Sequence, residues 1–239
     1  RLNTAFEKQR ILHENRKIGY KMTKREIKER VDNLISEMTV DEKIDQMVLI
    51  GCNETKELAD RIKNGEDLYI SSTYNAENIA IDEVYTIQEN QLKKGSSVPV
   101  LFAGESLHGL MHPNATVFPT EGCLAATFCP DLAQKFGETV AEEARSVGIR
   151  QVYGPNLDVV RDFRWGRTEE SFGEDTLLTA KMGVSVVKGL QKKGVAATIK
   201  HYLAYGLCEN GLNLSDAHVG ERELREFFLP TFAQCIKAG

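Results

Sequence analysis

The stretch VAATIKHYLAYG, residues 195–206, decides the fold that we expect for this chain. Residues 195–199 are apolar and rich in β-branched side chains, as in a buried strand, and Lys200 and His201 follow at once. Residues 98–102 repeat this arrangement, with Glu105 shortly beyond their end. Because a buried charge needs a partner or a polar ligand, these strand ends predict a site for a ligand rich in hydroxyl groups.

Strand and helix patterns alternate along the rest of the chain. The expected strands are 47–51, 68–75, 98–102, 149–153 and 195–199, and the expected helices are 24–38, 76–94, 130–147, 176–193 and 221–239. Thr39-Val40-Asp41-Glu42 has the pattern of a capping box that opens another short helix. This alternation is typical of a parallel sheet whose strands are joined by crossover helices.

Two α/β architectures have this alternation. A doubly wound sheet places a glycine-rich phosphate turn after an early strand, and neither GxGxxG nor GxxxxGK[ST] occurs in the sequence. A TIM-type (β/α) barrel places functional residues after the carboxyl ends of several strands. Glu105, Asp158, Arg167, Lys200 and His201 fall there, so the sequence predicts a barrel. The sequence holds about five or six strand-helix units, whereas a complete barrel has eight, so we expect the barrel to be incomplete.

Composition excludes several classes of protein. The 239 residues, 41% hydrophobic and 27% charged, suffice for a globular core, and a formal net charge of -5 with interspersed signs argues against a nucleic-acid partner. The charged amino terminus shows neither a signal peptide nor a membrane span, which favours the cytoplasm. No cysteine pattern indicates a metal or a disulfide framework, so we expect free thiols at Cys52, Cys123, Cys129, Cys208 and Cys235.

Six segments, taken together and in order, resemble glycoside hydrolase family 3. They are RVDNLISEMTVDEKIDQM (30–47), VPVLFAGESLHG (98–109), ATVFPTEGCLAATFCPDL (115–132), RDFRWGRTEESFGED (161–175), VAATIKHYLAYG (195–206) and VGERELREFFLPTF (219–232). On this resemblance, residues 24–239 are identified as part of the family's amino-terminal barrel domain, in its β-glucosidase and β-xylosidase branch. Residues 1–23 form an amino-terminal extension.

The resemblance implies a retaining exo-β-glycosidase that needs no cofactor or metal. Such an enzyme removes the terminal non-reducing sugar from a small oligosaccharide or an aryl or alkyl β-glycoside. Glu105, Arg167, Lys200 and His201 match the family's substrate-binding positions. A carboxylate can accept hydrogen bonds from two neighbouring hydroxyls, and the cationic groups can donate to others.

Several neighbouring residues invite other interpretations. We expect Arg161 and Asp162 to form a structural ion pair, and Trp165 either stacks on a sugar or packs its loop. Three acidic residues are expected to lie near a helix amino terminus and not to act in catalysis: Glu169, Glu170 and Glu174. His108 and His112 are expected to be packed and hydrogen-bonded.

Asp216-Ala217-His218 offers an alternative chemistry. In the N-acetylglucosaminidase branch of the family, an Asp-x-His pair transfers the proton. Here KHYLAYG replaces that branch's Pro-Gly-His-Gly run, and Asp216 lies further from Lys200 than in that branch. The segment 207–226 is more similar to the β-glucosidase and β-xylosidase branch, in which the acid is a glutamate of a later domain.

The resemblance also places the catalytic carboxyl groups beyond this sequence. In the family, the nucleophilic aspartate lies in an SDW- or SDY-like motif on a strand after the Lys-His pair, whereas this sequence ends at IKAG. We therefore expect a fragment that supplies part of a sugar pocket, is inactive alone, and has the missing carboxyl-terminal part as its partner. A non-catalytic sugar-binding module is the alternative. GESLHG resembles the EALHG form of β-xylosidases, which favours a pentose, and a glucoside remains open.

Overall fold

The computed structural model describes residues 22–51, 55–66, 68, 70–74, 78–93 and 98–239. The chain divides into two compact units, residues 1–43 and 44–239. Most of the expected extension 1–23, Cys52, and the ends of the expected segments 68–75 and 76–94 lie outside the described residues. No helix of the described part is long and apolar enough to cross a membrane.

The first unit holds α2 (Lys24–Glu37) and the start of α3 (Val40–Asp45). Both helices begin with reciprocal capping, in which a threonine hydroxyl and a glutamate side chain each bind the other residue's backbone N–H. Thr23 N donates to Glu26 Oε2 at 2.6 Å, and Thr39 N donates to Glu42 Oε2 at 2.8 Å. The capping box predicted at Thr39 is therefore confirmed.

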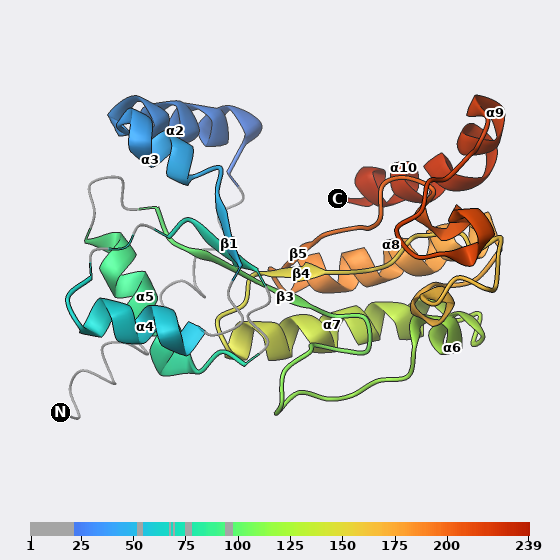
Figure 1. Ribbon diagram of the computed structural model, residues 1–239, viewed down its shortest axis with the longest axis horizontal. Coiled ribbons are helices and arrows are strands. Elements are labelled where there is room, and N and C mark those ends of the chain that lie inside the picture. Colours follow the sequence, from blue (N-terminus) through green and yellow to red (C-terminus); the bar gives the residue numbers. More distant parts are fainter. Residues whose placement is uncertain (1–21, 52–54, 67, 69, 75–77, 94–97) are drawn as a thin grey trace. The chain divides into compact units, whose positions relative to one another are not determined.

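The second unit is built on one parallel five-stranded sheet (Figure 1). Its strands are β1 (Leu49–Gly51), β2 (Ser72–Tyr74), β3 (Leu101–Glu105), β4 (Gln151–Tyr153) and β5 (Ala196–Ala197), in the order β1-β2-β3-β4-β5. Ala103 lies opposite Gln151, and Val152 lies opposite Ala197. A doubly wound sheet reverses its strand order at a switch point. This sheet never reverses, so it is an arc of a (β/α) barrel, as predicted.

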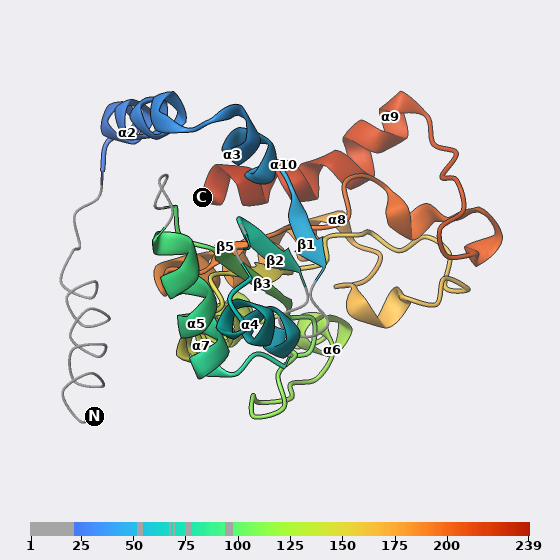
Figure 2. The same cartoon turned by 60° about the vertical axis from the view of Figure 1, so that its left-hand side comes forward.

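Helices lie between successive strands and after the last one. Those between strands are α4 (Thr55–Lys63), α5 (Ile81–Leu92), α6 (Glu121–Ala125), α7 (Pro130–Ser146) and α8 (Thr176–Lys192), and the 3₁₀ turn η1 (Thr168–Glu170) precedes α8. After β5 come the 3₁₀ turns η2 (Tyr205–Leu207) and η3 (Glu209–Gly211), the helix α9 (Glu221–Glu223), the π turn η4 (Leu224–Phe228) and the helix α10 (Leu229–Ala238). Figure 1 shows α7 and α8 beside the strands β3 to β5, and Figure 2 shows α4 beside α5.

Two expectations need correction at this level. The expected helix 221–239 is interrupted by the π turn η4, and α10 follows with Pro230 in its first turn. Proline has no N–H to donate to the preceding turn, which explains the break. The helix α4 was not anticipated, although a crossover between β1 and β2 requires one.

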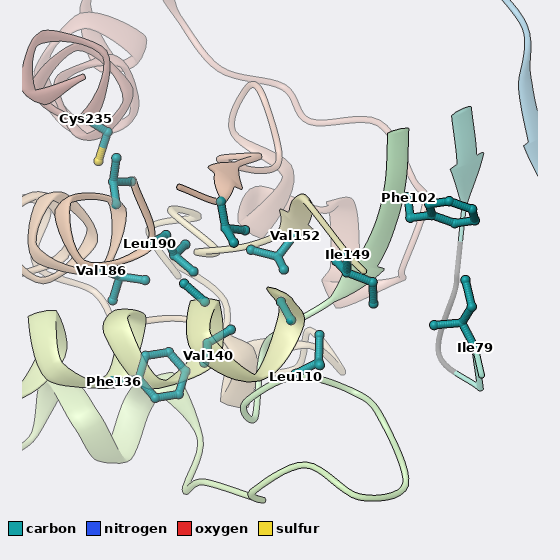
Figure 3. Packing of buried hydrophobic residues seen from close by; sticks show 14 of the residues in the cluster. Ile79, Phe102, Leu110, Phe136, Val140, Ile149, Val152, Val186, Leu190 and Cys235 are labelled. Carbon is teal, nitrogen blue, oxygen red and sulfur yellow. The ribbon is translucent and has the colours of Figure 1, made fainter. Parts of the chain in front are cut away.

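The core lies between the strands and the helices α7 and α8 (Figure 3). Phe102, Ile149 and Val152 contribute from the strands and their ends, and Val140 and Leu190 contribute from α7 and α8; all five are buried. This packing fixes the direction of β3 and β4, and with it the position of the loops at their carboxyl ends.

Candidate functional site

The four predicted site residues meet at the carboxyl ends of neighbouring strands. Glu105 ends β3, Lys200 and His201 follow β5, and Arg167 lies in the loop after β4. Lys200 Nζ is 2.7 Å from Glu105 Oε2, and Arg167 Nη1 is 3.3 Å from His201 Nε2. Residues from three chain segments therefore form one cluster, where a barrel places its functional groups.

The Glu105–Lys200 ion pair joins two strands that are not neighbours in the sheet. β4 lies between β3 and β5, so the pair crosses the end of β4. Both side chains are largely buried, with 18% of Glu105 and 11% of Lys200 exposed. A pair this buried depends on both partners, because removing one leaves an uncompensated charge in a poorly hydrated place.

His201 is held from both sides of its ring. Its Nδ1 lies 2.7 Å from Asp158 Oδ2, and its backbone N donates to the same oxygen at 3.3 Å. On the other side Nε2 faces Arg167. A guanidinium only donates, and a carboxylate only accepts. These partners assign a neutral imidazole with the proton on Nδ1, which leaves Nε2 as an acceptor.

Arg167 is oriented by Glu170, on the adjoining 3₁₀ turn η1. Two hydrogen bonds, of 2.9 and 2.6 Å, run from the guanidinium to the two carboxylate oxygens. These bonds raise the pKa of Arg167 further, against the opposing effect of burial. The ring of Tyr205 lies beneath, 5.6 Å from the guanidinium carbon and 4.9 Å from the His201 ring centre. Glu170 is thus an orienting carboxylate, and the expected helix-terminus role is not what its contacts show.

The expected Arg161–Asp162 ion pair is wrong. Asp162 accepts hydrogen bonds from the guanidinium and the backbone N of Arg164, which lower the pKa of its carboxyl to about 2. Arg161 instead lies over the ring of Phe227, at 4.4 Å. The cause is local, because the turn that brings Arg164 N to within 3.0 Å of Asp162 Oδ1 carries its side chain there too.

Trp165 packs its loop, which was one of its two expected roles. Only 1% of the residue is exposed, and its Nε1 donates to Asn213 Oδ1 at 3.1 Å. Asn213 Oδ1 also accepts from the Tyr205 hydroxyl at 2.6 Å. Hydrogen bonding to Asn213 thereby joins the loop after β4 to the loop after β5.

Among the described residues, His112 and His218 lie outside this cluster and show no catalytic arrangement. His112 is hydrogen-bonded, as expected, since its Nδ1 accepts from Asn114 N at 3.3 Å. His218 is 77% exposed and lies 3.6 Å from Glu209 Oε2. Asp216 accepts Glu209 N at 3.0 Å through its backbone carbonyl. The Asp-His dyad considered as an alternative is therefore not formed.

Two further groups join the site from outside the predicted set. Asp158 stood at a strand end in the sequence, and it holds His201. Glu121, the first residue of α6, is 1% exposed and accepts Asn156 N at 3.1 Å. Glu121 lies outside every helix expected from the sequence, and nothing in the local pattern indicates that it is buried.

Metal ligands and disulfides are not seen in the described part of the chain. Its His, Cys, Asp and Glu residues form no group able to hold a metal ion. Cys123, Cys129, Cys208 and Cys235 are free thiols, as predicted for them.

Comparison with known proteins agrees with this geometry. The family model described as "Glycosyl hydrolase family 3 N terminal domain" matches residues 39–239. The chain belongs to glycosyl hydrolase family 3. The match covers every strand and every residue of the site cluster.

Two curated relatives in family 3 have different sugar preferences in their names. A beta-xylosidase of Formosa agariphila is 34% identical over 226 residues, covering 89% of this chain and 26% of its own length. A periplasmic beta-glucosidase of Salmonella typhimurium is 34% identical over 218 residues, covering 87% of this chain and 28% of its own. The chain thus spans about a quarter of the length of these relatives.

A solved family 3 structure has the same fold. The beta-glucosidase from Listeria innocua in complex with glucose matches with a TM-score of 0.77 and 32% identity, over 88% of this chain and 32% of that one. With this match, the arc of five parallel strands is established as part of a family 3 TIM-type barrel.

Proposed function

We propose that this family 3 chain forms part of a monosaccharide pocket that serves hydrolysis of terminal β-glucosides or β-xylosides. The observation that carries the proposal is the meeting of Glu105, Arg167, Lys200 and His201 at one edge of the sheet. Glu105 and His201 offer acceptors there, and Lys200 and Arg167 offer cationic donors. A sugar ring presents hydroxyls that need both kinds of partner.

In both contacts of the cluster, Glu105–Lys200 and Arg167–His201, sugar hydroxyls can replace the partner side chain as donor or acceptor. Glu105 can accept from one hydroxyl while Lys200 donates to the next, so each keeps a polar partner. His201 Nε2 accepts and Arg167 donates in the same way on the second pair. Contacts that tighten as the sugar ring distorts toward an oxocarbenium ion would contribute to rate as well as to affinity.

The chemical step itself needs carboxyl groups other than those of this cluster. Retaining hydrolysis uses two carboxyl groups about 5–5.5 Å apart, one as nucleophile and one as acid/base. Glu105, Asp158 and Glu170 are each bound to a cation or an imidazole. We propose that the 239 residues bind the sugar without hydrolysing its glycosides, and that the catalytic carboxylates come from elsewhere in the complete enzyme.

The sugar is proposed to be xylose or glucose. The relatives include proteins named for each activity at equal identity, 34%. Glu105 is longer than the aspartate found in many family β-glucosidases, and a longer carboxylate leaves less room for a 6-hydroxymethyl group. A pentose is therefore the preferred ligand, and a sugar-binding module without chemistry is the second candidate, because every carboxylate of the cluster is already paired.

Calorimetry with xylose and glucose tests the pocket, and hydrolysis of aryl β-xyloside and β-glucoside tests the chemistry. We expect binding without turnover, and Lys200→Ala should weaken binding roughly tenfold or more, since it strands Glu105. The matched control is Lys192→Ala, which breaks an exposed ion pair with Glu138 and should leave affinity unchanged. Robust turnover would place the catalytic groups in this chain. Absence of binding would refute the pocket.

A further inference from the structure

We propose that Glu121 is a positioning residue of the sugar site, acting on His201 through the buried chain Glu121–Asn156–Asp158–His201. This inference rests on the proposed function for its meaning, since His201 matters as a sugar ligand. The hydrogen bonds of the chain are formed without a bound sugar. Among the described residues, no hydrogen bond or ion pair joins Glu121 to Arg167 or His201, so we infer that it acts through the residues between.

Each link of the chain is a hydrogen bond, and the first and the last join different segments. Asn156 N donates to Glu121 Oε2 at 3.1 Å, Asp158 N donates to Asn156 Oδ1 at 2.8 Å, and His201 Nδ1 lies 2.7 Å from Asp158 Oδ2. Helix α6, the loop after β4 and the end of β5 are thus joined in one line. The loop after β4 is fixed to the β5 end by backbone bonds as well, since Leu157 N donates to Lys200 O at 2.6 Å.

Burial gives the chain its rigidity. Glu121, Asn156 and Asp158 are each at most 1% exposed. Water cannot replace a lost hydrogen bond at such depth without a rearrangement, so an unpaired group there is costly. Asn156 Nδ2 and Asp158 Oδ1 have no hydrogen-bond partner in the described structure. Few alternative hydrogen bonds could therefore hold these residues if one were lost. The helix α6 contributes to the chain by accepting from Asn156 N through Glu121.

The start of α6 also supports the second sugar contact. Gly122 packs against the segment that follows η1, so closely that a Cβ there would lie 3.3 Å from Ser171 O and 3.8 Å from Glu169 O. Glu170, on η1, orients Arg167. A shift of α6 would therefore reach both Arg167 and His201, whose side chains contact each other at 3.3 Å.

Glu121 is unlike a carboxylate placed to bind a ligand. Burial is the largest influence on its carboxyl and raises its pKa well above the usual value. The negative charges of Glu170 and Asp158 raise it further, whereas Asn156 N–H and the charge of Lys200 lower it. A neutral carboxyl keeps a carbonyl oxygen that can accept from Asn156 N, which is all that the positioning role requires.

The imidazole of His201 gives a direct readout of this role. Nitrogen-detected NMR of the ring nitrogens reports the tautomer, and the His201→Gln variant identifies the signal among the histidines. The wild-type chain should show the single Nδ1–H tautomer without any sugar. Glu121→Gln should preserve it, because the amide oxygen still accepts from Asn156 N. Glu121→Ala should give a mixture of tautomers.

The matched control is Leu124→Ala, on the same helix. Leu124 packs against the core and takes no part in the hydrogen-bonded chain, so its loss should lower stability and leave the His201 signal unchanged. If Glu121→Ala does not fold, Asn156→Ala cuts the next link and should give the same mixture of tautomers. A single unchanged tautomer in every folded variant of Glu121 and Asn156 would overturn the proposal.

Sugar affinity separates this proposal from the proposed function. Where the wild type binds xylose or glucose, Glu121→Ala should bind roughly tenfold more weakly, and Glu121→Gln should bind normally. If no variant binds a sugar but the His201 tautomer still depends on Glu121, the pocket is refuted and the positioning role stands. Weakened binding in Leu124→Ala equal to that in Glu121→Ala would count against a specific role.

Discussion

At the scale of single residues, the question for the buried carboxyl groups is where the proton resides. Asp158 has the imidazole and the backbone N of His201 as partners for its Oδ2. Among the described residues, the hydrogen-bond partner of the Glu121 carboxyl is the backbone N of Asn156. Burial raises the pKa of the Glu121 carboxyl well above its usual value, and the Asn156 N–H lowers it only in part. The folded chain therefore holds a proton on Glu121 more firmly than an exposed glutamate does.

This placement predicts a pH dependence of stability for Glu121. Its pKa is raised in the folded chain, so the folded state holds the proton more tightly than the unfolded state. The contribution is complete below the ordinary glutamate pKa and is lost as pH rises toward the folded value, by at most about 1.4 kcal/mol per pH unit. Urea unfolding from about pH 5 to pH 8 should show wild type losing stability relative to Glu121→Gln. The prediction is contradicted if the stability of wild type relative to Glu121→Gln stays constant, or if wild type gains relative stability as pH rises.

Sequence patterns identified which residues gather at the site but not how they pair. The strand-end rule found Glu105, Arg167, Lys200 and His201, because position after a strand is a local property. Partners are set by turn geometry and by segments far away in the sequence. Asp162 therefore bonds Arg164 and not Arg161, and Glu121, on the helix α6, accepts from Asn156 N in the loop after β4.

At the scale of elements, the contact of α7 with α8 depends on two glycines. A Cβ on Gly137 would lie 2.5 Å from Val186 O, and one on Gly189 would overlap Gln134 O and lie 2.9 Å from Glu138 N. These obstacles are backbone atoms, which cannot rotate away. The two helices therefore approach until their backbones touch, and this close contact places the strand β4 that they flank.

Gly189→Ala tests this contact. Alanine favours a helix over glycine by about 1 kcal/mol, so an exposed site would gain stability. Here we expect a loss of about 1–3 kcal/mol from overpacking, measured by urea unfolding. Gly166→Ala serves as the control, because open space surrounds that position, and it should change stability by no more than about 0.5 kcal/mol. If the two variants have equal free energies of unfolding, α7 and α8 can move apart enough to accept the methyl group without loss of stability.

Element boundaries were predicted well where local signals mark them. Pro130 begins α7 and Asp175 caps α8 through its bond to Leu178 N, and both helices lie within one residue of the expected ranges. The strands agree less well with their apolar runs: β5 is confined to Ala196 and Ala197, and β3 (Leu101–Glu105) lies three residues later than the expected 98–102. Apolar runs report burial, whereas strand ends are set by which neighbour is within reach.

At the scale of the whole chain, the sheet has two open edges among the described residues. β1 pairs only with β2, and β5 pairs only with β4. In β5, Ala196 N and Thr198 N donate to Arg150 O and Val152 O of the β4 side. Successive amides of a strand point in opposite directions, so Ala197 N points to the open edge. Unpaired edges of this kind recruit other strands.

We therefore expect the isolated chain to self-associate with rising concentration, as measured by light scattering after size exclusion. Ala197→Pro removes the outward donor, and proline is accepted at such an edge position, so this variant should be more monomeric and remain folded. Ala196→Pro is the matched control, because it removes the bond to Arg150 O and should lower stability instead. If the wild-type chain stays monomeric over the same concentrations, or Ala197→Pro associates as strongly, the open edge of β5 does not drive association.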